Sequence, residues 1–257
     1  MLIIDKKILI FNFREVHFSD KPFDIDDCDF LNFHYCKNEV NVKGFTCKKK
    51  FTIVIDLTQD LDIILQNIKV KNDVSRQLYL AKKEGIRIRK NEGYDQFFKM
   101  YRSFIQKKGI KSLFDIFGVG SITLESMKKN GTLFVAEYNG EIIYGTLYLE
   151  DNSHIKSWIS ASKRFELDSS KKKLTAAAKR LIDLEAIKYA KGKGIKEYDL
   201  GGIWSEEETE KDATKKSINT FKLRLGGKIV TRYSYQKSYS KTCTLVNYLY
   251  CLKNLNR

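Results

Sequence analysis

Histidine and proline are scarce in this chain of 257 residues, which holds three histidines and the single proline Pro22. His17, His34 and His154 occur in no motif, so we expect each of them to be structural. No Gly-x-Ser-x-Gly elbow accompanies them, which disfavours a Ser-His-Asp hydrolase. A P-loop is missing as well. The sequence therefore favours neither a Ser-His-Asp hydrolase nor a P-loop nucleotide-binding protein.

The cysteines offer neither a disulfide framework nor a metal site. There are five of them, and no Cys-x-x-Cys pair or other metal-ligand spacing joins them. We expect reduced thiols in a cytoplasmic protein that binds no metal. The residues are Cys28, Cys36, Cys47, Cys243 and Cys251.

Long apolar runs are also missing. The segment from Met1 to Phe13 meets Asp5, Lys6 and Lys7 after only three apolar residues, unlike the continuous apolar core of a signal peptide. No stretch approaches the roughly 20 apolar residues that span a bilayer. The sequence predicts a cytoplasmic protein, either free or held at the inner face of the membrane.

Positive charge is in excess, and it is unevenly placed. The net charge is +15, yet residues 1–60 carry nine Lys/Arg against ten Asp/Glu, so residues 61–257 carry 38 against 22. Such an excess attracts partners that carry phosphate, such as nucleic acids, nucleotide-sugars, coenzymes or anionic lipids. A solvated, lysine-rich surface explains the same composition equally well.

From residue 58 onwards, the apolar pattern predicts a regular α/β order. The turn dipeptides Asn139-Gly140 and Asp151-Asn152 join three strands into an antiparallel meander, and a long helix then leads to a further strand. A meander followed by a strand-helix-strand crossover requires a mixed sheet. Helices are expected at 61–68, 74–83, 94–107, 122–129, 171–191 and 215–225, and strands at 86–89, 133–138, 141–150, 154–160, 197–200 and 228–235.

The two ends of the chain look different from this body. Residues 1–57 show strand-like runs only at 8–13 and 51–57, separated by the acidic stretch 24–29. We interpret 1–57 as a truncated accessory lobe, 58–240 as the main domain and 241–257 as a tail helix. The apolar face expected for 243–252 suits either the core or an anionic membrane surface.

Three motifs resemble one family. They are Tyr198-Asp-Leu-Gly-Gly-Ile203 followed by Phe221-Lys-x-x-x-Gly-Gly227, the segment Arg76–Ile86, and Trp158-Ile-Ser-Ala-Ser162. Together they are similar to the Fem peptidoglycan-bridge peptidyltransferases and to the GNAT acyltransferases related to them. The resemblance implies a GNAT-like acyltransferase fold with a truncated N-terminal lobe.

The resemblance also implies a reaction in which an amine attacks an ester or thioester through a tetrahedral intermediate. It places Lys222 in the substrate channel, where a cation stabilises the developing oxyanion. Asp199, at a strand end, is either a proton acceptor for the amine or an anchor for its own loop. We take both residues as the catalytic candidates.

Substrate contacts follow from the same motifs. An arginine at position 76 is associated in the family with the phosphates of the acceptor, and Lys83 lies two turns further along the same helix face. Two glycines after a strand allow a ligand to approach the backbone, although a turn alone would also explain them. The expected substrate-binding residues are Arg76, Lys83, Trp158, Ser160, Gly201, Gly202, Trp204 and Phe221.

The start of the long helix is a candidate phosphate site. Free backbone N–H groups there, together with Ser170, Lys171 and Lys172, suit a phosphate group. However, no glycine occurs from 146 to 191, whereas acetyl-CoA-dependent GNAT enzymes have a glycine-containing loop at this point. This absence disfavours ordinary CoA binding.

Three functions remain open at this stage. The first is transfer of an aminoacyl group from aminoacyl-tRNA to an amine of a phosphate-bearing cell-envelope precursor. The second is acyl-CoA-dependent acylation of an amino sugar of a surface polysaccharide. The third is a noncatalytic basic module that binds nucleic acid or membrane. The donor in the first two is a substrate, so no bound cofactor is expected.

Overall fold

The computed structural model describes residues 1–8, 10–69, 72–108, 123–168 and 171–242, and these form two compact units. The first unit comprises 1–51 and 230–242, and the second comprises 52–108 and 123–229. Strands β4 (Thr46–Asp56) and β10 (Lys228–Ser238) run from one unit into the other. The division at 57/58 and 240/241 stays a prediction, and the expected tail helix at 243–252 lies outside the described residues.

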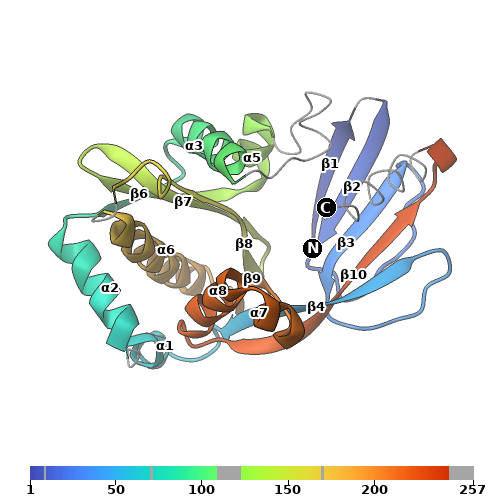
Figure 1. The fold of residues 1–257 in the computed structure, drawn as a ribbon. Coiled ribbons are helices and arrows are strands. Elements are labelled where there is room, and N and C mark those ends of the chain that lie inside the picture. The colour runs from blue at the N-terminus through green and yellow to red at the C-terminus, as the bar shows by residue number, and fades with distance from the viewer. Residues whose placement is uncertain (9, 70–71, 109–122, 169–170, 243–257) are drawn as a thin grey trace. The chain divides into compact units, whose positions relative to one another are not determined.

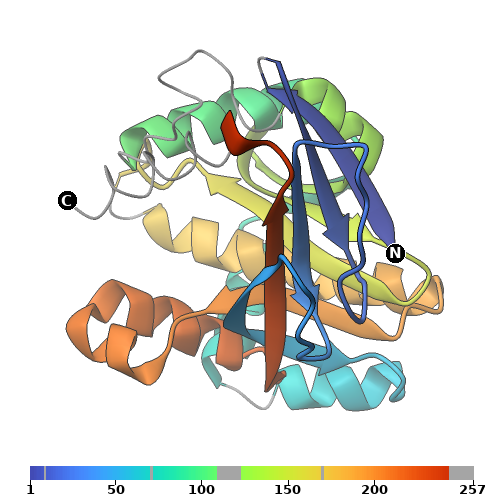
Figure 2. The same cartoon turned by 90° about the vertical axis from the view of Figure 1, so that its right-hand side faces the viewer.

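The first unit is built from strands (Figure 2). β1 (Leu2–Ile8) pairs antiparallel with β2 (Phe11–His17), which pairs parallel with β3 (Phe30–Cys36), and β3 pairs antiparallel with β10. One sheet face buries Val16, Leu31, Phe33 and Tyr235. Within residues 1–57 the sequence predicted strands only at 8–13 and 51–57, because the charged residues in β1 and β2 obscure the apolar alternation.

The second unit confirms the predicted α/β class. Its strands follow the order β4-β9-β8-β7-β6-β5, with an antiparallel meander from β6 to β8 and a parallel pair β8/β9. The strands are β5 (Arg87–Lys90), β6 (Thr132–Tyr138), β7 (Glu141–Glu150), β8 (His154–Ser162) and β9 (Glu197–Ile203). The helices are α1 (Leu61–Lys69), α2 (Asn72–Lys83), α3 (Tyr94–Lys107), α5 (Leu124–Asn130), α6 (Lys172–Gly192), α7 (Glu206–Lys211) and α8 (Ala213–Leu223).

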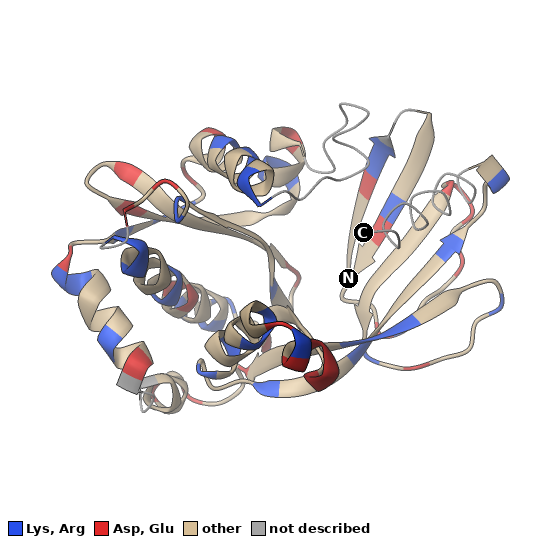
Figure 3. Ribbon diagram, in the orientation of Figure 1, with Lys and Arg blue, Asp and Glu red and all other residues tan. Residues whose placement is uncertain are grey.

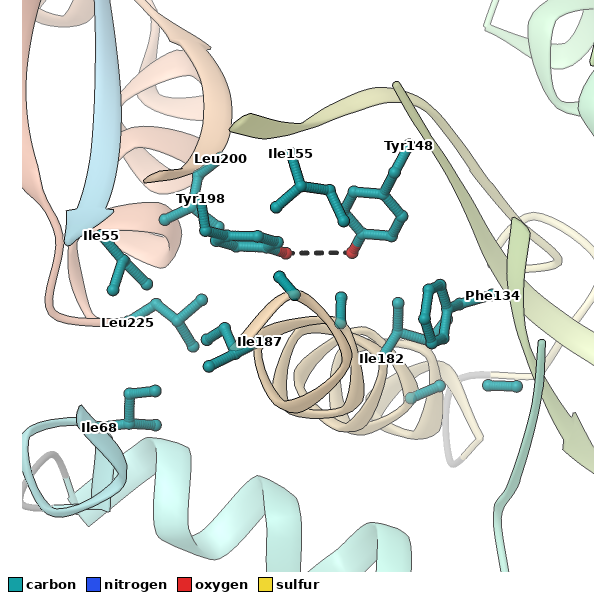
Figure 4. Packing of buried hydrophobic residues seen from close by; sticks show 14 of the residues in the cluster. Ile55, Ile68, Phe134, Tyr148, Ile155, Ile182, Ile187, Tyr198, Leu200 and Leu225 are labelled. Carbon is teal, nitrogen blue, oxygen red and sulfur yellow. Dashed lines mark hydrogen bonds between the residues drawn. The ribbon is translucent and has the colours of Figure 1, made fainter. Parts of the chain in front are cut away.

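Helices cover both faces of this sheet (Figure 1). α6 packs on one face of β6 and β7, with α2 outside it, and α3 packs on β7 and β8 from the other face. On the α6 side, Phe134, Ile155 and Ile187 belong to one buried cluster (Figure 4). α6 is the connection that makes β8 and β9 parallel. No helix in the described part of the chain is long and apolar enough to cross a membrane.

The segment after β9 differs from its prediction. The sequence predicted no helix or strand between residues 201 and 214, but Glu206–Lys211 is the short helix α7. Ser205 accepts a hydrogen bond from the Glu208 amide, and the Glu208 carboxylate accepts one from the Ser205 amide, which is a capping box. The Asp212 side chain then caps α8, so α8 begins at Ala213 instead of 215.

The packing of α3 on β7 gives a first prediction. A Cβ added at Gly145 would lie 2.4 Å from Cδ2 of the buried Phe97 ring. Gly145→Ala is therefore expected to lower the free energy of unfolding by about 1–3 kcal/mol, measured by urea denaturation followed by circular dichroism. In the control Gly192→Ala the new Cβ meets no atom within 4 Å. The control should leave stability unchanged or raise it slightly, and equal effects of the two changes would contradict the packing.

Candidate functional site

The candidate site lies where β8 and β9 part. Their ladder contains three pairs, from His154↔Glu197 to Lys156↔Asp199, although both described strands continue beyond it. After Asp199 the facing edges of the two strands no longer pair with each other. Backbone groups at such an edge remain available to an extended ligand.

A β-bulge in β8 accompanies this separation. Tyr148 pairs with Ser157 and Leu147 pairs with Ile159, so Trp158 is the extra residue. Because a bulge shifts the alternation of side chains, Ile155 packs in the α6-side cluster whereas Ile159 packs in the α3-side cluster. Bulges of this kind are common beside active sites, where they redirect a side chain.

Lys222, on α8, reaches the part of β9 that follows Asp199. The sequence predicted that the strand ends at residue 200, but β9 continues to Ile203. Lys222 Nζ donates a hydrogen bond to the Gly202 carbonyl oxygen at 2.7 Å. Gly201 has a φ of 83°, which side-chain-bearing residues rarely adopt. A Cβ there would lie 3.5 Å from Lys222 Nζ and 3.6 Å from the Ser157 carbonyl oxygen. The predicted residues Lys222, Gly201 and Gly202 are therefore in direct contact.

The surroundings of Lys222 disfavour its charge. Burial and, to a smaller extent, nearby Lys179 lower the pKa of its ammonium group and Asp199 and Asp183 raise it, and the net result is a decrease from 10.5 to about 8. Near neutral pH the side chain is still mostly protonated. It is thus a poorly hydrated cation, which interacts strongly with any negative charge placed beside it.

Asp199 is buried and serves the local structure. Its Oδ1 accepts hydrogen bonds from the Thr52 hydroxyl and, at 2.7 Å, from the Gly201 amide, and its Oδ2 lies 3.6 Å from Lys156 Nζ. These contacts hold β4, β8 and the Gly201 segment of β9 together. A role in accepting a proton from substrate stays a prediction.

A buried polar network connects α6 to β9. The Asp183 carboxylate, 1% exposed, accepts a hydrogen bond from the Tyr198 hydroxyl at 2.6 Å and pairs with the Lys179 ammonium. The Tyr198 and Tyr148 hydroxyls are 3.0 Å apart (Figure 4). Burial, reinforced by the Asp183 charge, raises the pKa of both phenols well above 10, so both stay neutral.

Arg180, also on α6, fixes the residue next to Lys222. Its guanidinium stacks on the Phe221 ring at 3.5 Å, and Nη2 donates to the Phe221 carbonyl oxygen at 2.6 Å. Its Nε donates to Gln77 on α2 at 3.1 Å. The sequence did not point to Arg180 or Asp183. The available signal was the presence of two charged residues, three apart, in the apolar pattern of the long helix.

The remaining predicted contacts are more dispersed. Arg76 and Lys83 are exposed on α2, and among the described residues no hydrogen bond or ion pair joins them to Lys222. The Trp204 backbone N–H donates a hydrogen bond to the side-chain oxygen of Asn219, on α8, at 3.2 Å. The Asn219 side-chain nitrogen in turn donates one to the Trp204 carbonyl oxygen at 2.8 Å. Ser160 is 3.0 Å from Thr146 through the two hydroxyls. That these residues, Trp158 and Phe221 contact substrate stays a prediction.

The predicted phosphate site is described only in part. Lys171 and Lys172 are exposed at the start of α6, and Ser170 lies outside the described residues. The Lys171 amide donates to the Asp168 carboxylate at 2.9 Å. One N–H group at this end of the helix thus already has an anionic partner.

Several solved structures have similar folds. FemX has a TM-score of 0.60 at 12% identity, covering 95% of this chain and 85% of its own. The C-terminal domain of a protein from Agrobacterium fabrum named as a lysylphosphatidylglycerol synthetase has a TM-score of 0.56 at 10% identity. The match covers 92% of this chain and 80% of that domain. L-PGS from Bacillus licheniformis has a TM-score of 0.54 at 11% identity, and the match covers 95% of this chain and 83% of L-PGS. No family model matches the sequence, and no curated protein matches it. The chain therefore has the predicted GNAT-like acyltransferase fold, a conclusion that concerns the fold alone.

The buried ammonium gives a second prediction. Since folding lowers the pKa of Lys222 to about 8, the folded state is penalised below that pH, and the penalty disappears as the pH rises towards 10.5. Lys222→Met loses the hydrogen bond to Gly202 but also removes the penalty. We expect it to be more stable than the wild type by about 1–2 kcal/mol at pH 7 and to lose this advantage at high pH.

Urea denaturation at several pH values measures this difference. The control is Lys216→Met, an exposed position on the same helix, which should change stability little at any pH. A Lys222→Met protein that is less stable than the wild type at every pH would contradict the description of Lys222 as a desolvated cation.

Proposed function

We propose that this protein transfers an aminoacyl group from aminoacyl-tRNA to an amine of a cell-envelope precursor. The observation that carries the proposal is the Lys222 ammonium, held against Gly202 where β8 and β9 part in an acyltransferase fold. FemX and L-PGS, which share the fold, support the aminoacyl donor by their names.

The proposed reaction is acyl transfer through a tetrahedral intermediate. The acceptor nitrogen attacks the ester carbonyl carbon, and the electrons of the C=O bond move to its oxygen. The intermediate then collapses, the bond to the ribose oxygen breaks, and the proton lost by the amine passes to that oxygen. A fixed donor at the carbonyl oxygen lowers the barrier by about 3–4 kcal/mol.

Lys222 is suited to be that donor. One of its three N–H groups is directed to the Gly202 carbonyl, which leaves two for a substrate oxygen. Desolvation makes its charge more effective than that of a surface lysine. Asp199 is then a positioning residue, because it holds the Gly201 amide and thereby the segment of β9 that Lys222 contacts.

The charges at the start of α6 and on the other helices favour tRNA over CoA as the proposed donor. The Asp168 carboxylate at the start of α6 already accepts a backbone N–H there, and its negative charge repels a pyrophosphate. Lys and Arg side chains are distributed over α3, α6 and α8 (Figure 3), as expected for a protein that contacts an extended polyanion. Transfer from acyl-CoA to an amino sugar remains the second candidate, because a GNAT-like fold suits both donors.

The acceptor is proposed to carry phosphate. Arg76 and Lys83 are both exposed and seven residues apart on α2, so two successive phosphates could bind along that helix face. A precursor with a lipid anchor would bring the protein to the inner face of the membrane without a spanning helix. Arg76 and Lys83 both belong to the second unit.

The third prediction tests donor and site together. Purified protein is incubated with radiolabelled aminoacyl-tRNA or with acetyl-CoA, each with a lipid-linked muropeptide or with phosphatidylglycerol vesicles. Transfer from aminoacyl-tRNA to the muropeptide amine is expected, and Lys222→Ala should slow it by roughly 100- to 1000-fold. Lys216→Ala, on the same helix, is the control and should leave the rate unchanged. The wild-type rate should fall as the pH rises through about 8, because the ammonium is the active form.

Each contrary result identifies a different error. Transfer from acetyl-CoA alone would replace the donor, and transfer to phosphatidylglycerol alone would replace the acceptor. Normal transfer by Lys222→Ala would remove Lys222 from the mechanism. Binding of tRNA or vesicles without any transfer would favour the noncatalytic basic module.

A further inference from the structure

Three potential metal ligands come together in the first unit. The ligand atoms of Glu15, His17 and His34 all lie within 4.8 Å of one another. Glu15 and His17 are on β2 and His34 is on β3, which are neighbouring strands (Figure 2). The proposed transfer reaction uses none of these residues.

The strand register explains the cluster. β2 and β3 are parallel, and His17 is directly paired with His34. Glu15 is two residues before His17, so alternation along the strand places both on the same sheet face. Val16 and Phe33 point to the opposite face, where they are fully buried in the core of the unit.

The side chains of the two histidines and Glu15 lie close together. The two imidazole rings are stacked, with centroids 4.6 Å apart and planes 9° from parallel. Their Nε2 atoms lie 3.7 Å and 3.9 Å from the same carboxylate oxygen, Oε2 of Glu15. Two nitrogens and one oxygen therefore surround a common space, and they come from the same side of the sheet.

The backbone is distorted next to both histidines. Phe18 and Tyr35, which directly follow them, have φ angles of 61° and 60°. This left-handed conformation costs a residue with a side chain roughly 1–2 kcal/mol. β3 also has a bulge here, because Tyr233 pairs with Cys36 whereas Tyr235 pairs with Phe33. Paired strain and a bulge are typical of sites where side-chain direction matters for function.

The charge of Glu15 is maintained despite its surroundings. Burial raises the pKa of its carboxyl, but His17, Lys6 and His34 together lower the pKa to about 2. Lys6 Nζ lies 2.8 Å from Oε1, the other carboxylate oxygen. The ionised Glu15 thus offers Oε2 to the histidines while Oε1 is held by Lys6.

From this geometry we propose that Glu15, His17 and His34 bind one divalent transition-metal ion, for which Zn²⁺ is the best match. Two imidazole nitrogens and one carboxylate oxygen form a usual zinc ligand set, and water completes the tetrahedron. Zinc–ligand bonds are about 2.0–2.2 Å, so the ligand atoms, which lie within 4.8 Å of one another, would move closer together on binding. The stacked imidazole rings would also rotate so that both nitrogens face the ion. The ion would link β2 to β3 and stabilise the first unit.

The fourth prediction is measured by calorimetric titration of Zn²⁺ into reduced protein without a histidine tag. We expect one equivalent to bind, the melting temperature to rise with zinc, and Co²⁺ to give visible d–d absorption bands. His17→Ala and His34→Ala should each weaken binding at least roughly tenfold, and Glu15→Gln should also weaken it. Lys6→Met should strengthen binding, since it removes a positive charge beside the ion.

A matched control is His154 in the second unit. It also lies near two carboxylates, but Asp151 is 2.9 Å from its Nδ1 and Glu197 is 3.9 Å from its Nε2. Ligands on opposite ring nitrogens cannot share an ion, so His154→Ala should bind zinc as the wild type does.

Equal zinc binding by the wild type and by both cluster variants would overturn the proposal. A loss with His154→Ala as large as that with His34→Ala would do the same, as would a wild type that binds no zinc. Circular dichroism establishes that each variant is folded. Should the buried His17 be required for folding, His34→Ala, with a side chain 25% exposed, decides the matter.

Discussion

The candidate site depends on one buried carboxylate. Asp183 pairs with Lys179 on its own helix and accepts a hydrogen bond from the hydroxyl of Tyr198, which immediately precedes Asp199 on β9. An ionised carboxylate in an apolar cluster is costly unless it is fully paired, so α6 has little freedom to move relative to β9. Arg180, one turn earlier, extends the same constraint to Phe221. Lys222 is therefore positioned through α6, although it belongs to α8.

Burial of the Lys222 ammonium group lowers the stability of the fold, but it also places a desolvated cation in the candidate site. A lysine that faced water would keep its ordinary pKa and contribute little to a reaction. Here burial and the neighbouring Lys179 lower the pKa to about 8, while Asp183 and Asp199 prevent complete loss of charge. The side chain is held between these opposing effects. Conflict between local stability and local chemistry is what distinguishes functional positions from core positions.

Much of the second unit could be predicted from the sequence. Regular apolar spacing and turn dipeptides located α6, the meander and the strand before Gly201, because their side-chain pattern reflects burial on one face. Lys222 and Gly202 were assigned to the substrate channel by a resemblance and not by periodicity, and their contact is seen only in the structure. Arg180 and Asp183 were missed, since a charged residue in a helix is usually exposed and only the tertiary structure shows these two to be buried. β3 was also missed, and its pairing with β10, which is distant in sequence, leaves no signal in the local pattern.

The histidine cluster illustrates the same limit from the other direction. Sixteen residues separate His17 from His34, which is not a spacing typical of a metal-binding motif. The sequence alone therefore predicted that these histidines are structural. Parallel pairing of two strands brings them side by side, and local spacing carries no information about such a pairing. Glu15 joins them only because alternation along β2 matches that register. A shift of one residue in the pairing of β2 with β3 would place His34 opposite Val16 or Phe18 and separate the three ligands, so the site exists only in the folded sheet.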